Sequence, residues 1–199
     1  MSYFLKYFFV FCFLFFAQLN LAHAQAVGRS RGSAPAPKFS SGRSGTLLDF
    51  AVFYGQDEAT ANPNVGNEYI DNDSVYDIKL GYIFNNDFYF GGDLSVRNYS
   101  YIGGTSTGQA TGVGFGYFFS NNFNLRAYYR FNESYADYRD GSGFQADLNY
   151  SINLSSNFYF GFLITHRQTT FTTNSQIAGF EKWTYKSTNP AITFGFLVN

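Results

Sequence analysis

The sequence is poor in cysteine, in charge and in long apolar runs. Cys12 is the only cysteine among 199 residues and lies in the first apolar segment, so the rest of the chain has no disulfides, thiolate catalysis or cysteine metal sites. Only 14% of the residues are charged and the formal net charge is −1, which gives no reason to expect a nucleic-acid partner. Mean hydropathy is −0.18, too low for a bundle of membrane helices.

Aromatic residues, in contrast, are abundant. Phe contributes 26 residues and Tyr 17, so aromatics make up 22% of the chain. An ordinary soluble domain of this size cannot bury so many rings, and their abundance together with so little charge argues against intrinsic disorder. A surface that alternates between lipid and water accommodates both the rings and the polar average.

The first 45 residues divide into two segments. Residues 1–24 are interpreted as a secretory signal peptide, with an apolar core at Tyr7–Phe16 and a small-x-small cleavage site at Ala22-His23-Ala24. The apolar core has roughly half of the ~20 residues that a transmembrane helix needs. Residues 25–45 are rich in Ser, Gly, Ala and Pro and contain four basic residues and no acid. They are predicted to form a flexible, basic periplasmic linker.

From residue 46 to 199, apolar residues recur at every second position, which predicts β-strands. The eight expected apolar faces run over Leu48–Tyr54, Tyr76–Phe84, Phe88–Val96, Thr111–Phe119, Phe123–Phe131, Phe144–Leu154, Phe158–Ile164 and Ile192–Val198. Three connections are tight: Asn85-Asn86-Asp87, Ser120-Asn121-Asn122 and Ser155-Ser156-Asn157. Four are longer and polar: 56–73, 98–109, 134–142 and 168–189.

Strands of about ten residues, joined alternately by short turns and long loops, are typical of a transmembrane β-barrel. Because lipid offers no hydrogen-bond partners, such a sheet must close on itself. We therefore expect an all-β protein, an eight-stranded antiparallel up-and-down transmembrane β-barrel. Aromatic residues beside the tight turns and at the opposite strand ends are expected to form two interfacial girdles.

The interior of a barrel of this size is filled by side chains. A network of lumenal ion pairs is predicted from the charged residues on the faces opposite the apolar ones: Asp49, Asp77, Lys79, Asp93, Arg97, Arg126, Arg130, Asp147 and Arg167. Counting outward from the first turn places Lys79 opposite Asp93, and we expect these two to form an ion pair. The same count pairs three large residues with three glycines: Arg126 with Gly116, Tyr128 with Gly114, and Arg130 with Gly112.

This interior has two interpretations. In the first, it is a polar plug whose buried charges persist because they are paired. In the second, it is a narrow gated pore whose pairs rearrange.

Two loops contain candidate contact residues. The first loop has five acids and no base (Asp57, Glu58, Glu68, Asp71 and Asp73), which fits either a solvated acidic loop or oxygen ligands for a divalent ion. The fourth loop has two lysines and two large aromatics (Lys182, Trp183, Tyr185 and Lys186). These four are candidates for contact with lipopolysaccharide or a partner cell, or alternatively for packing on the barrel rim.

The layout of residues 46–199 resembles the small outer-membrane barrel families, the OmpA transmembrane domain and the OmpX-type proteins. The resemblance rests on the eight alternating strands, three tight turns, four loops and the closing strand Phe194-Gly195-Phe196-Leu197-Val198-Asn199. It implies the outer membrane of a Gram-negative bacterium, with both termini periplasmic and the four long loops extracellular. The implied role is envelope integrity, adhesion or surface interaction.

The same resemblance implies partners. These are outer-membrane lipid, lipopolysaccharide and the barrel-assembly machinery, which in these families recognises a final Phe. Here the chain ends at Asn199, with aromatics at Phe194 and Phe196. A filled barrel needs no second copy to close its edges, so a monomer is expected.

A barrel enzyme acting on lipid A is the remaining alternative. Some eight-stranded barrels are lipid A deacylases or palmitoyl transferases, and the deacylase type has a His-x-Ser pair on its outer wall. His166 is the only histidine after the predicted signal peptide, and alternation places it on the lipid face. Gln168 stands where the serine would be. We therefore expect no enzyme activity, no cofactor and no metal.

Overall fold

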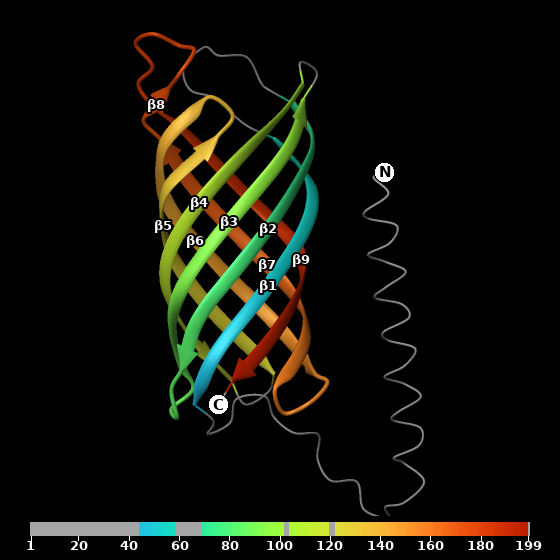
Figure 1. Ribbon diagram of the computed structural model, residues 1–199. Helices are drawn as coiled ribbons and strands as arrows, with labels where there is room; N and C mark the ends of the chain where they lie inside the picture. The colour runs from blue at the N-terminus through green and yellow to red at the C-terminus, as the bar shows by residue number, and fades with distance from the viewer. Residues whose placement is uncertain (1–43, 59–68, 102–103, 120–121, 199) are drawn as a thin grey trace, which may run out of the picture. The chain divides into compact units, whose positions relative to one another are not determined.

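The computed structural model describes residues 44–58, 69–101, 104–119 and 122–198, and most of these form β-strands (Figure 1). The described ranges contain no helix long and apolar enough to cross a membrane. The predicted signal peptide, 1–24, and nearly all of the predicted linker, 25–45, lie outside them.

Within these ranges, eight long strands and one short strand make up a single antiparallel sheet. They are β1 (Gly45–Glu58), β2 (Tyr69–Ile83), β3 (Phe88–Tyr101), β4 (Gly104–Phe118), β5 (Phe123–Tyr135), β6 (Tyr138–Asn153), β7 (Phe158–Phe171), β8 (Thr173–Asn174) and β9 (Trp183–Val198). Pairing of β5 with β6 and of β1 with β9 closes the eight long strands into a barrel. The predicted fold class is confirmed. The two-residue β8 pairs with Tyr138 and Arg139, the first residues of β6, at the loop end (Figure 1).

The three tight turns fix the strand register. In each hairpin the residue before the turn donates its N–H to the carbonyl of the residue after it, as from Phe84 to Phe88 at 2.8 Å. Asp87 and Asn122 have φ values of 64° and 71°, in the left-handed region that Asp and Asn tolerate better than most residues. Counting residues outward from the turns therefore predicted the correct cross-strand neighbours, including Lys79 opposite Asp93.

The strands reach further past the apolar belt than predicted, so the loops are shorter. The loop expected over 168–189 is occupied by β7 up to Phe171 and by β9 from Trp183. The loop expected over 134–142 shrinks to two residues between β5 and β6. Backbone hydrogen bonding between strands continues where the outward residues become polar. The alternation of apolar residues ends there, so the sequence pattern does not predict these strand ends. Part of the predicted first loop, 59–68 with Glu68, lies outside the described residues.

The outward faces form an apolar belt around the barrel. Large side chains on them stay exposed, such as Phe115 at 68% and Tyr129 at 59%. Near the turns the exposed residues include Phe84, Phe88, Phe119 and Phe123, and towards the other end Tyr54, Tyr76 and Phe131. The inward faces hold the charged residues. This inside-out distribution positions the candidate site.

Candidate functional site

The barrel interior is the candidate site, and its side chains form layers along the barrel axis. At the turn end an apolar layer fills the lumen, made of Leu47, Ile83, Tyr89, Phe118, Tyr128, Tyr159 and Leu197. The Tyr128 hydroxyl donates to the Tyr89 hydroxyl at 3.3 Å. The turn end of the interior is therefore occupied by packed rings and aliphatic side chains.

Above this layer lie the charged residues. All nine predicted lumenal residues point inward, and none is more than 4% exposed. Arg126 lies 2.5 Å from Asp49, and Arg167 lies 2.5 Å from Asp77. A further carboxylate, Asp147, lies 2.6 Å from the ammonium of Lys79. The predicted network exists, and several of its pairs join strands on opposite sides of the barrel.

The predicted ion pair between Lys79 and Asp93 is wrong. The two residues are cross-strand neighbours, but the Lys79 ammonium lies between Asp147 and Asp77, at 2.6 and 3.5 Å. Asp93 instead lies 3.1 Å from Arg130. Long side chains in a narrow lumen reach across it, so register alone does not select the partner.

Among the described residues, sequence alternation missed one interior acid, Glu133. Register shifts on either side of Glu133 mark a β-bulge in β5, and Asn132 has a φ of 52°. The extra residue reverses the alternation and turns Glu133 inward, where it is 3% exposed and lies 3.1 Å from Arg130. Five acids now face five bases among the described interior residues: Asp49, Asp77, Asp93, Glu133 and Asp147 against Lys79, Arg97, Arg126, Arg130 and Arg167.

Neutral polar side chains complete the network. Gln145 donates to Asp147 at 2.9 Å and accepts from Arg167 at 2.8 Å. Thr165 donates to Asp147 at 2.8 Å and Ser95 donates to Asp77 at 2.7 Å. The three bonds donated to carboxylates fill acceptor positions that the ion pairs leave open, and the bond from Arg167 to Gln145 satisfies a buried guanidinium donor.

Glycines on β4 make room for large side chains on β5, as predicted. Gly114 lies opposite Tyr128 and Gly116 opposite Arg126. A Cβ added at Gly114 would lie 2.5 Å from the Tyr128 ring, and one at Gly116 would lie 2.5 Å from the Arg126 side chain. Small residues on one strand thus allow the lumen to accept bulky ones from the next.

An aromatic layer occupies the loop end of the interior. It consists of Tyr135, Tyr138, Phe171, Trp183 and Tyr185. Trp183 and Tyr185 are 2% and 1% exposed. The expectation that they belong to an exposed loop is therefore wrong: both are inward residues of β9. Lys182 and Lys186 are exposed, so only these two of the four contact candidates lie on the surface.

Arg97 connects the aromatic layer to the charged one. Its guanidinium lies 4.9 Å from the Tyr135 ring centre and 4.7 Å from that of Tyr185. It also lies 3.9 Å from Glu133. Stacking of a cation on two desolvated rings holds the guanidinium in place.

His166 lies on the outer wall, as predicted. Its Nδ1 is 2.7 Å from the hydroxyl of Thr188, its cross-strand neighbour on β9. No group of three or more His, Cys, Asp or Glu that could hold a metal ion is found in the described part of the chain.

No protein-family model and no curated protein matches the sequence. Among solved structures, the outer membrane protein OprG from Pseudomonas aeruginosa matches with a TM-score of 0.43 and 10% sequence identity, over 83% of this chain and 100% of that chain. A similarity of this degree carries no argument about function.

Proposed function

We propose that this chain is an integral outer-membrane β-barrel protein with a side-chain-filled lumen and a structural or surface-interaction role. One observation carries the proposal: charge lies inside the barrel and large apolar side chains lie outside it. In water this arrangement would expose many rings and bury ten charges. In a bilayer, the closed sheet satisfies its backbone and the belt meets acyl chains. The proposed partners are membrane lipid, lipopolysaccharide and the barrel-assembly machinery, and the proposed state is a monomer.

The proposed orientation places the turn end in the periplasm and the loop end outside the cell. Thr46 pairs with Val198, so the first strand begins and the last strand ends at the turn end of the barrel. Short periplasmic turns and longer outer connections are the usual arrangement in such barrels. Lys182 and Lys186 are then available to anionic groups at the cell surface.

The filled lumen favours a plug over a gated pore. The charged layer lies between the apolar layer at the turn end and the aromatic layer at the loop end. Breaking a buried ion pair leaves an uncompensated charge and costs about 3–5 kcal/mol. Opening a water path through the lumen would require several such breaks together with displacement of both layers.

Conductance of the refolded barrel in planar bilayers tests the plug. We expect no steady single-channel current from the wild-type protein, because packed side chains occupy the lumen. Steady channels whose unit conductance changes in the lumenal variant Asp147→Asn, but not in the outward-facing variant Thr111→Val, would show an ion path and contradict the plug.

A barrel enzyme is the second candidate, because a base and a hydroxyl are in hydrogen-bond contact on the outer wall, His166 with Thr188. A serine-hydrolase-like site also needs a group that orients the base, and the hydrogen bonds found for His166 include no carboxylate. We therefore expect lipopolysaccharide incubated with the barrel to keep its acyl chains in mass spectra. Loss or transfer of acyl chains that stops in both His166→Ala and Thr188→Val would establish an enzyme instead.

A further inference from the structure

The outward faces of β2, β3 and β4 change from apolar to polar near their loop ends. On β2 the outward series passes from Tyr76 to Ser74, and on β3 it passes from Val96 to Asn98 and Ser100. The outward residues at the loop end of β4 are Thr105 and Thr107. The apolar belt is thus followed on these strands by hydroxyl and amide side chains.

These polar residues form continuous rows across neighbouring strands. Tyr54 pairs with Ser74, Ser74 with Asn98, and Asn98 with Thr107. The second row contains Ser100 and Thr105, which also pair. Three interstrand spacings give the first row a length of about 14 Å, enough for a chain of linked rings rather than a single small molecule.

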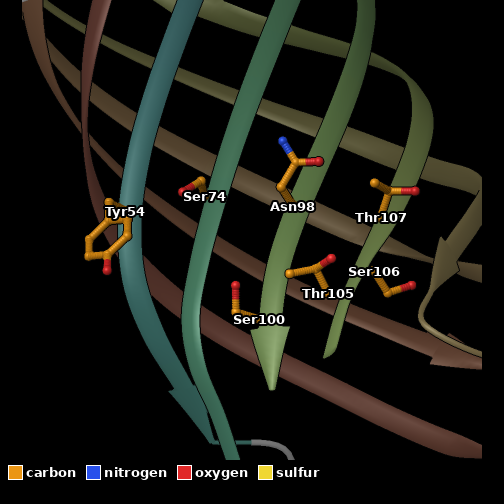
Figure 2. Close-up of a pocket in the computed structure, with 7 residues that line it drawn as sticks. All are labelled: Tyr54, Ser74, Asn98, Ser100, Thr105, Ser106 and Thr107. Carbon is orange, nitrogen blue, oxygen red and sulfur yellow. The ribbon is translucent and has the colours of Figure 1, made fainter. Parts of the chain in front are cut away.

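The rows lie in a groove of about 690 Å³ (Figure 2). Its described lining consists of one tyrosine and six uncharged polar residues: Tyr54, Ser74, Asn98, Ser100, Thr105, Ser106 and Thr107. Figure 2 shows that they come from four adjacent strands. The groove is therefore a concavity at the loop end of the barrel wall, built from residues of β1 to β4.

The chemistry of this lining selects a class of ligand. Hydroxyl and amide groups both donate and accept hydrogen bonds, as the hydroxyls of a sugar require. Phosphate or carboxylate groups are recognised by Arg and Lys, and no charged side chain is found among the described lining residues. The Tyr54 ring, 65% exposed, offers an apolar face with a polar tip. A neutral saccharide matches these features.

We propose that this groove binds the uncharged saccharide portion of a membrane glycolipid. The proposal rests on the proposed function, because it requires the belt to lie in lipid. Tyr76 and Val96 are the next outward residues below Ser74 and Asn98, and both are exposed in the belt. A sugar in the groove therefore has its acyl chains directly against the belt. This continuity favours a lipid-linked saccharide over a free one.

The test uses the full barrel in nanodiscs and backbone NMR shifts. The three probes are a diacylglycerol carrying an uncharged trisaccharide, the same trisaccharide free in solution, and the diacylglycerol alone. We expect the glycolipid to shift amide signals of 98 and 105–107, with weaker binding of the free sugar and no effect of the bare lipid. The variant Ser74→Ala/Asn98→Ala/Thr107→Val should weaken glycolipid binding at least about tenfold, since it removes three hydrogen-bonding groups.

Thr184→Val is the matched control, because it removes a hydroxyl from the outer wall on β9, away from the groove. It should bind like the wild type. Glycolipid shifts that are absent, that occur elsewhere or that survive in the triple variant would overturn the proposal, as would tighter binding of the free sugar. Failure of the barrel to insert into nanodiscs would instead contradict the proposed membrane function itself.

Discussion

At the scale of single residues, the interior is held by charges that share partners. The Lys79 ammonium serves two carboxylates, Asp147 at 2.6 Å and Asp77 at 3.5 Å. Asp77 also pairs with Arg167. Each charge is fully buried, so the removal of one partner leaves the others uncompensated.

The variant Lys79→Met tests this sharing. We expect it to lower the free energy of unfolding by about 3–5 kcal/mol, the usual effect of breaking a buried ion pair. The measurement is urea unfolding in lipid vesicles, followed by the fluorescence of Trp183, the only tryptophan. Lys186→Met is the matched control on the exposed outer face and should change stability by less than about 0.5 kcal/mol. Equal effects of the two variants would refute the shared buried network.

Alternation in the sequence predicted nine of the ten charged residues described in the lumen, but not how they pair. A two-residue period indicates on which face of a strand a side chain lies. It does not indicate how far that side chain extends across the lumen. Lys79 on β2 meets Asp147 on β6, and Arg126 on β5 meets Asp49 on β1. These partners depend on side-chain length and strand tilt, which the sequence pattern does not contain.

At the scale of strands, the bulge in β5 shows how one residue redirects a side chain. Asn132 in the left-handed region supplies the extra residue, and Glu133 consequently points inward. The same bulge explains the failure of sequence parity at this position. The lengths of the strands were also underestimated. Polar residues beyond the apolar belt still form backbone hydrogen bonds with the neighbouring strand.

Substitution of Asn132 tests the bulge. Asn132→Gly should leave the free energy of unfolding nearly unchanged, because Gly adopts a positive φ readily. Asn132→Val should lower it by about 1–2 kcal/mol, the cost of the left-handed conformation for an ordinary residue. Urea unfolding of both variants gives the comparison. A valine variant as stable as the glycine variant would mean that no left-handed residue is required here.

At the scale of the whole molecule, apolar side chains cover the outside of the barrel and charged ones lie inside it. This distribution indicates that lipid rather than water surrounds the barrel wall. Eight alternating stretches sufficed to predict a closed barrel. Each stretch forms a strand with one apolar and one polar face, and a sheet of such strands in lipid must close on itself. Among the described residues, aromatic side chains gather in the outer belt and in the ring layers at both ends of the lumen. The groove on β1 to β4 was not predicted, because it also requires the register of β1 with β2 and of β3 with β4, which none of the three predicted tight turns fixes.

The most direct test of the membrane-embedded belt is cysteine labelling on intact cells with a hydrophilic maleimide, in a Cys12→Ala background. Single cysteines replace three exposed residues: Leu148 in the belt, Ala178 at the loop end and Asn86 at the turn end. We expect Ala178→Cys to react on intact cells, Asn86→Cys only after the outer membrane is permeabilised, and Leu148→Cys in neither case. Labelling of Leu148→Cys in the intact membrane would contradict the account, and exchanged reactivities of the other two would reverse the orientation.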